Sequence, residues 1–106
     1  MDQRTPPQTE EGWYVSHDCR RIDWDAWRDA PERVRERALT EGIDFFYAYE
    51  GLADAADGQT AVYTVMGHKA DIMVLHLRPT MADLDAAERH FEQTEFAGFT
   101  ERAFSY

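Results

Sequence analysis

The sequence is poor in three features, and each shortage excludes a class of protein. Cys19 is the only cysteine, so the intrachain disulfide framework of small secreted domains is excluded. Lys69 is the only lysine, and 11 basic residues stand against 21 acidic ones, for a net charge of −10. Binding to nucleic acid or to an anionic membrane needs an excess of bases, so the charge balance disfavours both.

Long apolar runs are the third shortage. No run approaches the roughly 20 residues of a membrane-spanning helix, and residues 1–12 lack the apolar segment of a signal peptide. We therefore expect a cytoplasmic protein with a disordered polar tail over residues 1–11. A surface rich in carboxylates and almost free of lysine indicates adaptation to high salt, where charge repulsion is screened within about 3 Å.

What is present fits one folded domain. The chain has 106 residues, of which 43% are hydrophobic and 13% aromatic, enough for a real core. Residues 12–22 alternate in the manner of a strand, with Trp13, Val15, His17 and Cys19 on one side. A helical pattern follows, in which Asp23 caps a short first turn.

Two helices and three further strands complete the pattern. Pro31 breaks the helical segment near Ala30, and Asp29 is the expected cap of a long helix that continues past Gly42 to about Ala53. Strands at 60–66 and 70–77 form a hairpin through 67–69. Thr80 caps a second amphipathic helix, with Asp83 three residues on, and a last strand covers 99–106.

The element order β-α-β-β-α-β predicts an α+β, ferredoxin-like fold: a four-stranded antiparallel sheet with two helices on one face. In the strand 70–77, alternate residues divide into Ala70, Ile72, Val74 and His76 on one side and Asp71, Met73, Leu75 and Leu77 on the other. Both sides are largely apolar. Since the helices can cover only one, we expect another structure to cover the second.

Candidate ligands for a metal or a haem are few. His68 and His76 are eight positions apart, roughly 26 Å for a fully extended chain, so they cannot share a metal ion. His17 and Cys19 lie on one side of the first strand, which should run beside the third, so either could approach His76. A His-x-Cys pair alone is a weak metal signal, and we favour a buried thiol and a histidine at the core edge.

Other signatures of chemistry are missing. The sequence contains no nucleophile elbow, phosphate-binding loop or dinucleotide glycine pattern. Arg20 and Arg21 could bind a carboxylate ligand, but we expect Asp18 and Asp23 to be their partners. The charged run at 32–37 is interpreted as a solvated helix face.

Three separated segments resemble one family. They are GWYVSHDCRRIDWDAWR at 12–28, TVMGHKADIMVLHLRPT at 64–80 and FSY at 104–106. Together they resemble the chlorite dismutase-like superfamily, and most closely its coprohaem decarboxylase (haem biosynthesis) branch in salt-loving organisms. The resemblance implies a subunit of two ferredoxin-like halves packed sheet to sheet as a dimeric α+β barrel, usually assembled as a homo-oligomeric pentamer. Residues 12–106 would be the N-terminal half.

The resemblance also implies where the chemistry lies. In the family, the haem ligand, the redox tyrosine and the propionate-binding residues belong to the C-terminal half, beyond the position of Tyr106. His17, His68 and His76 do not match the haem ligand, and Tyr106 does not match the radical tyrosine. We therefore assign no catalytic, cofactor-binding or metal-binding residue to this chain, and we expect haem or coprohaem to be held by the other half.

The implied parent is a haem-dependent oxidoreductase that uses peroxide to convert two propionates of coprohaem to vinyls; chlorite breakdown is the more distant relative. The chain alone is expected to be inactive. Two alternatives stay open. One is a stand-alone dimeric α+β barrel resembling monooxygenases, with a pocket between sheet and helices near His17, His76 or a tryptophan. The other is a non-enzymatic pairing module.

Overall fold

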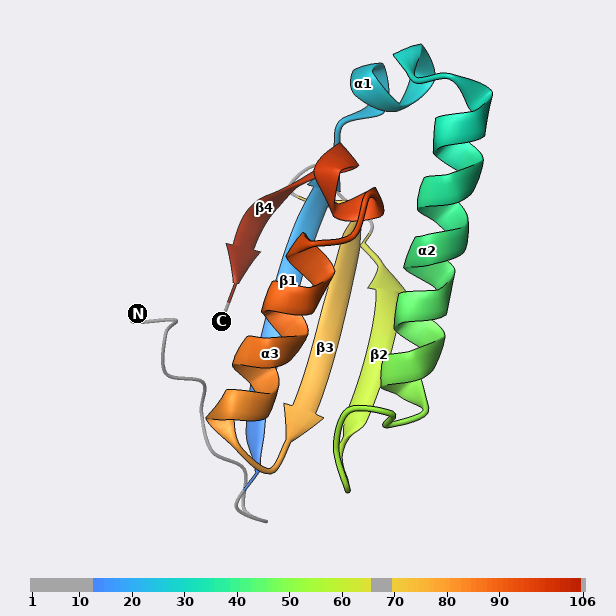
Figure 1. The fold of residues 1–106 in the computed structure, drawn as a ribbon. Helices are drawn as coiled ribbons and strands as arrows, with labels where there is room; N and C mark the ends of the chain where they lie inside the picture. The colour runs from blue at the N-terminus through green and yellow to red at the C-terminus, as the bar shows by residue number, and fades with distance from the viewer. Residues whose placement is uncertain (1–12, 66–69, 106) are drawn as a thin grey trace.

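The computed structural model describes residues 13–65 and 70–105, and it forms a two-layer α/β sandwich (Figure 1). Its strands and helices occur in the predicted order, including the short helical turn after Asp23, with a 3₁₀ turn that was not predicted. They are β1 (Tyr14–Ile22), α1 (Trp24–Asp29), α2 (Glu32–Glu50), β2 (Gln59–Thr64), β3 (Ile72–Arg78), α3 (Met81–Glu92), η1 (Phe96–Phe99) and β4 (Thr100–Ser105).

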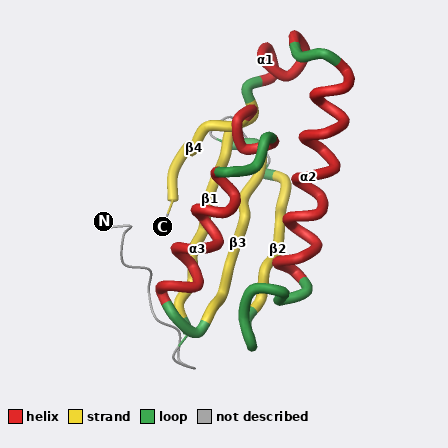
Figure 2. The backbone as a smooth tube through the Cα atoms, in the orientation of Figure 1, coloured by secondary structure: helices red, strands yellow, loops and turns green. Residues whose placement is uncertain are grey.

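The four strands form one antiparallel sheet in the order β2-β3-β1-β4. Helices α2 and α3 lie side by side on one face of this sheet, and no described element covers the other face (Figure 2). The ferredoxin-like prediction is confirmed, including the neighbouring placement of the first and third strands. Residues 1–11, His68 and Tyr106, for which the sequence also predicted features, lie outside the described residues.

Helix boundaries follow the cap signals in two of three cases. The Asp23 carboxylate accepts a hydrogen bond from the Ala26 amide at 3.0 Å, and the Thr80 hydroxyl accepts one from the Asp83 amide at 3.1 Å, as predicted. The predicted cap at Asp29 is wrong. Pro31 itself occupies the cap position of α2, without a side-chain hydrogen bond, and Asp29 is the last residue of α1.

Helix α2 runs through Gly42, as predicted, but ends at Glu50 rather than near Ala53. Gly42 is useful in the middle of this helix because η1 crosses close to it. A Cβ at this position would lie 3.2 Å from the Phe96 side chain. A buried aromatic cluster between the two helices, built around Phe45, Tyr49 and Phe91, fixes their separation.

Strand ends differ from the predictions by one or two residues. The predicted strand 60–66 is β2 at Gln59–Thr64, and the predicted strand 70–77 is β3 at Ile72–Arg78. The shift at β3 matters, because it brings Arg78 into the sheet, where its side chain is completely buried. Strand β4 begins after η1, so Phe99 belongs to the 3₁₀ turn and not to the strand.

Candidate functional site

The helix-free face of the sheet is an apolar surface made by three strands. Strand alternation and the β1–β3 register place Val15, His17 and Cys19 opposite Leu77, Leu75 and Met73 on this face. Ala61 and Tyr63 extend it onto β2. Cys19 is buried within the sheet, Tyr63 is 49% exposed, and the other side chains are partly exposed. Such a patch is typical of an interface.

The opposite face of the sheet, beneath the helices, buries charged groups where a hydrophobic core is usual. Asp18, Arg20 and Arg78 are each 3% exposed or less, and His76 is 3% exposed. Groups of this kind are almost never buried without partners. In this structure each of these four side chains has hydrogen-bond partners.

Arg20 ties α3 to the sheet. Its guanidinium donates to the Asp18 carboxylate at 3.0 Å and to Glu92 on α3 at 2.8 Å. The guanidinium carbon lies 4.9 Å from the centre of the Phe91 ring, a cation–π contact. The hydrogen bond from Arg20 lowers the pKa of Glu92, so this carboxylate remains charged.

A second arginine, Arg102 of β4, adds to this network. It lies 3.5 Å from Asp18 and 3.9 Å from Glu88 on α3. Glu88 also accepts a long hydrogen bond of 3.4 Å from the Ser16 hydroxyl. Burial raises the pKa of Glu88, and the charge of Arg102 opposes that rise. The contacts of α3 with β1 and β4 are therefore mainly charged, with only the Leu84, Ala87 and Phe91 side of the helix buried as apolar surface.

Arg78 connects α2 to the sheet, as Arg20 connects α3. Its guanidinium donates two hydrogen bonds to Asp54, at 2.9 and 3.0 Å, and one to the Tyr49 carbonyl at 3.2 Å. It also donates to the carbonyls of Gln59 and Leu77, each at 2.8 Å. The side chain thus satisfies carbonyls near the end of α2 and holds the connection to β2 in place.

His76 is a structural histidine in the buried polar layer. Arg78 donates to the Thr60 hydroxyl at 2.8 Å, and the same hydroxyl is hydrogen-bonded to Nδ1 of His76, 2.7 Å away. Burial, together with the charge of Arg78, lowers the pKa of His76 to about 4. The ring is neutral at neutral pH, and its Nδ1 is already engaged by Thr60.

The predicted approach of His17 or Cys19 to His76 is wrong. The register pairs His17 with Leu75 and Cys19 with Met73, whereas His76 pairs with Ser16. His76 therefore lies on the helix side of the sheet, next to the Tyr49 ring, and the other two lie on the helix-free side. Burial, with the charge of Asp18, raises the pKa of the Cys19 thiol, so it is a poor nucleophile.

The remaining candidates are arginines that form ion pairs. Arg21 pairs with Glu101 of β4 at 2.8 Å, not with Asp23 as predicted, whereas the predicted Arg20–Asp18 pair is confirmed. Within the described ranges 13–65 and 70–105, no group of three or more His, Cys, Asp and Glu side chains could hold a metal ion. No helix in the same ranges is long and apolar enough to cross a membrane.

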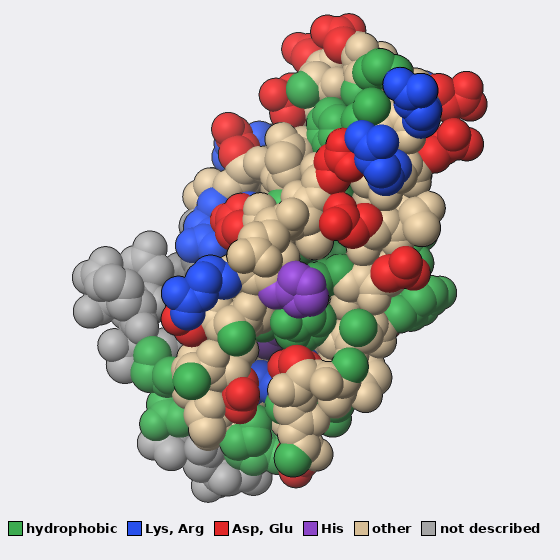
Figure 3. Space-filling view, viewed as in Figure 1, with side chains coloured by type: hydrophobic (Ala, Val, Ile, Leu, Met, Phe, Trp, Pro, Cys, Tyr) green, Lys and Arg blue, Asp and Glu red, His purple; other side chains and the backbone are tan. Residues whose placement is uncertain are grey.

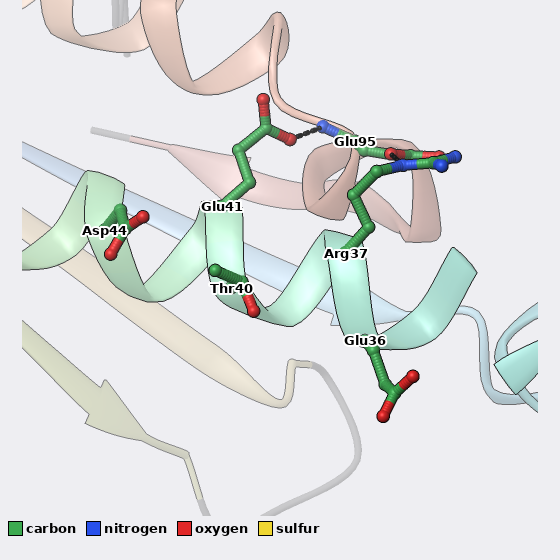
Figure 4. Close-up of a pocket in the computed structure, with 6 residues that line it drawn as sticks. All are labelled: Glu36, Arg37, Thr40, Glu41, Asp44 and Glu95. Atoms are coloured by element: carbon green, nitrogen blue, oxygen red, sulfur yellow. Dashed lines mark hydrogen bonds and ion pairs between the residues drawn. The ribbon is translucent and has the colours of Figure 1, made fainter. Parts of the chain in front are cut away.

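An open hollow lies between α2 and η1 (Figure 4). Arg37 pairs with Glu95 at 2.7 Å, and Glu41 accepts a hydrogen bond from the Glu95 amide at 2.6 Å. Thr40, Asp44 and Glu36 complete its lining. Glu41 and Glu95 thus already serve structural contacts, and we assign no chemistry to this hollow.

Comparison with known proteins supports this fold. A sequence model described as Chlorite dismutase matches residues 26–106. The chain belongs to the chlorite dismutase family. The chain is also similar to a "heme-binding protein" of Haloarcula marismortui, with 79% identity across the whole chain, and to one of Natronomonas pharaonis, with 62%. It spans only 16% and 18% of those two relatives, less than a fifth of their length.

Solved structures of similar fold also extend beyond this chain. A heme-binding protein from Thermus thermophilus superposes with a TM-score of 0.83 and 37% identity, over 90% of this chain and 38% of that one. A chlorite dismutase from Candidatus Nitrospira defluvii superposes with a TM-score of 0.75 over 92% and 39%, and at 21% identity it supports the fold alone. Each neighbour contains more than twice the residues matched here.

Proposed function

We propose that residues 12–106 form the N-terminal structural half of a haem-binding protein of the chlorite dismutase family, and that the helix-free face packs against a second ferredoxin-like half. One observation carries the proposal: Val15, Met73, Leu75 and Leu77 form an apolar surface that no described element covers. Burying such side chains yields about 25 cal/mol per Å². This chain contributes one of the two packed sheets, and its partner contributes the haem site.

The positions of His76 and Cys19 support that division. His76 is neutral, buried beneath the helices and bonded to Thr60, so it faces away from the proposed haem side. Cys19 is buried with a raised pKa. We therefore assign no haem ligand to this chain.

For the parent protein we propose coprohaem as the group acted upon. Its reaction would be the peroxide-dependent oxidative decarboxylation of two propionates to vinyls, in the cytoplasm. Family membership and the relatives named as heme-binding support haem chemistry. The choice of coprohaem rests on the resemblance of residues 12–28 and 64–80 to the decarboxylase branch.

The test uses the protein as its natural gene encodes it, purified in high salt, with haem content measured by the Soret band and intact mass. Leu75→Glu places a charge on the helix-free face and should abolish haem retention, although no haem ligand is altered. Met81→Glu places the same charge on an exposed apolar residue of the helix layer, 37% exposed, and should leave haem content unchanged. Retention of haem in Leu75→Glu would contradict the proposal.

A histidine variant tests whether the residue that binds the haem iron belongs to this chain or to its partner. His17→Ala alters the only described histidine on the helix-free face. The absorption spectrum of the bound haem should keep its shape in this variant. A change from a histidine-ligated to an unligated spectrum would place the iron on this chain and refute the proposed division.

A further inference from the structure

Tyr49 of α2 is a buried tyrosine whose hydroxyl is hydrogen-bonded to a base on α3. The residue is 6% exposed, and its hydroxyl oxygen lies 3.1 Å from Nδ1 of His90. No other hydrogen bond of this hydroxyl occurs within the described ranges 13–65 and 70–105. The other described tyrosines, Tyr14, Tyr47 and Tyr63, are partly or largely exposed. Tyr49 therefore combines burial with a neighbouring base, which none of these three does.

The surroundings of the Tyr49 ring disfavour a positive charge on it. The Phe45 ring stacks on it with centroids 4.4 Å apart, and the Arg78 guanidinium carbon lies 5.8 Å from its centre. Burial and the charge of Asp54 raise the pKa of the Tyr49 phenol, so it keeps its proton at neutral pH. An electron removed from this ring alone would leave a cation in an apolar site beside an arginine, which is costly. Loss of the phenol proton in the same step avoids that cation.

His90 is placed to accept the phenol proton. It is exposed and lies in the last turn of α3, where the helix dipole stabilises a cation. Together with Glu41 and Asp44 it lines an open cavity of about 380 Å³ between α2 and the end of α3. In Figure 3 a histidine is visible at the surface between the two helices, with acidic side chains near it. An imidazolium at His90 would thus be solvated and would share its cavity with two carboxylates.

We propose that Tyr49 and His90 form a one-electron redox site, in which oxidation of the phenol is coupled to proton transfer to the imidazole. The oxidant accepts one electron from the ring, the O–H bond of Tyr49 breaks, and the proton forms an N–H bond at Nδ1 of His90. The products are a neutral tyrosyl radical, an imidazolium and the oxidant reduced by one electron. The step uses the His90 tautomer that carries its proton on Nε2.

The oxidant is a one-electron oxidant derived from peroxide, and only this source rests on the proposed function. The site is distinct from the redox tyrosine that the family resemblance places in the other half. Burial of the ring beneath Phe45 keeps the radical away from solvent and from other chains. The site would therefore hold an oxidising equivalent longer than an exposed tyrosine such as Tyr47, which is 70% exposed.

The test generates the radical with light in the natural protein, so it requires no haem. A photo-oxidised ruthenium tris-bipyridine complex supplies the oxidant, electron paramagnetic resonance detects the tyrosyl radical, and transient absorbance gives its rate of formation. Tyr49→Phe removes only the hydroxyl and should abolish the long-lived radical signal. Tyr47→Phe, on the same helix but exposed, is the matched control and should leave that signal unchanged. Circular dichroism checks that both variants fold.

Variants of His90 separate a proton acceptor from a structural hydrogen bond. His90→Gln keeps a hydrogen-bonding partner for the Tyr49 hydroxyl but no base, and it should slow radical formation roughly 100-fold. His90→Ala should be slowed to a similar extent, and imidazole added to the buffer should restore its rate, because the cavity beside it is open to solvent. A structural hydrogen bond alone gives no such rescue.

The outcomes separate this site from the haem proposal. Slow formation in both His90 variants, with rescue by imidazole, supports the redox site. A long-lived signal that survives Tyr49→Phe, an unchanged rate in His90→Gln, or the absence of rescue would overturn it. Absence of haem from the natural protein would contradict the proposed function while leaving the photochemical result intact, and a haem-loaded protein without a Tyr49 radical would overturn this site alone.

Discussion

The helix-covered face of the sheet buries two arginines with their carboxylates, whereas the helix-free face presents valine, leucine and methionine side chains that stay partly exposed. In an ordinary two-layer domain, apolar side chains are buried beneath the helices and charged side chains lie on the face exposed to solvent. Arg20 and Arg78 orient the helices through directed hydrogen bonds, which specify one geometry but add little net stability. The apolar surface that should drive burial faces outward. The comparison teaches that one face of the sheet is closed within the chain, whereas no described element covers the apolar side chains of the other.

The largest effect should come from removing a buried charge on the covered face. Arg78→Met leaves the Asp54 carboxylate and the carbonyls of Tyr49 and Gln59 without their donor. Breaking a buried pair by removing one partner costs about 3–5 kcal/mol. Urea unfolding at constant high salt measures the change. Arg78→Lys restores the charge but not the six hydrogen bonds of the guanidinium, so it should recover only part of the loss. A loss below about 1 kcal/mol in Arg78→Met would show that the polar layer does not hold α2.

Acid should lower the free energy of unfolding through the protonation of His76, which lies on the same helix-covered face. Its pKa is about 4 in the folded protein, below the ordinary 6.5, because the ring is buried and faces Arg78. The unfolded chain therefore takes up the proton first as the pH falls. The stability contributed by the neutral ring is complete above pH 6.5 and is lost as the pH falls to about 4, by about 3 kcal/mol in total.

A neutral variant isolates the His76 contribution from the carboxylates that titrate nearby. His76→Gln keeps a hydrogen-bonding partner for the Thr60 hydroxyl, and its free energy of unfolding should fall less between pH 6.5 and 4 than that of the wild type. Urea unfolding at several pH values gives both curves. Parallel curves would mean that His76 does not carry this pH dependence.

A smaller loss should follow from a side chain at Gly58, which precedes β2. Its φ is +139°, and a Cβ there would lie 2.2 Å from the Leu77 carbonyl oxygen. Gly58→Ala should destabilise the protein by about 1–3 kcal/mol, read from its thermal transition. Gly98→Ala is the matched control, because a Cβ at Gly98 meets nothing within 4 Å. Equal effects of the two variants would argue against the close approach of Gly58 to β3.

The smallest effect should come from the helix-free face of the 106-residue chain by itself. Leu75→Glu there should change the free energy of unfolding by no more than about 0.5 kcal/mol, as for a surface position. Val74→Glu, one residue away, puts the same charge beneath the helices at a site 3% exposed and should cost about 4 kcal/mol or more. A similar loss in both variants, measured by urea unfolding, would mean that the two faces of β3 are equally closed.

Local patterns were enough to predict the fold. The caps at Asp23 and Thr80, the break at Pro31 and the two-residue alternation of β3 each depend on neighbouring residues, and they hold in the structure. The cap at Asp29 was wrong because Pro31 lies between Asp29 and the start of α2. The capping pattern alone did not show that the cap lies two residues later, at Pro31.

The strand register and the ion-pair partners that are distant in the chain could not be predicted from the sequence. Whether His76 meets Cys19 depends on the β1–β3 register, and a shift by one residue moves every side chain to the other face. The partners of Arg20 and Arg78 include Glu92 and Asp54, which lie 72 and 24 residues away in the sequence. The burial of these charges has no local signature. The bare apolar face, in contrast, follows from alternation alone, which is why the candidate site was found from β3.

Hydroxyl-radical footprinting of Met73 and Met81 in the natural protein at its native length tests the central claim most directly. Met73 lies on the helix-free face, and Met81 lies on the helix layer, 37% exposed. If the helix-free face is covered by a second half, Met73 should be protected from oxidation while Met81 is oxidised, and Met73 should become reactive in the 106-residue chain alone. Equal oxidation of Met73 in the natural protein and in that chain would contradict the account.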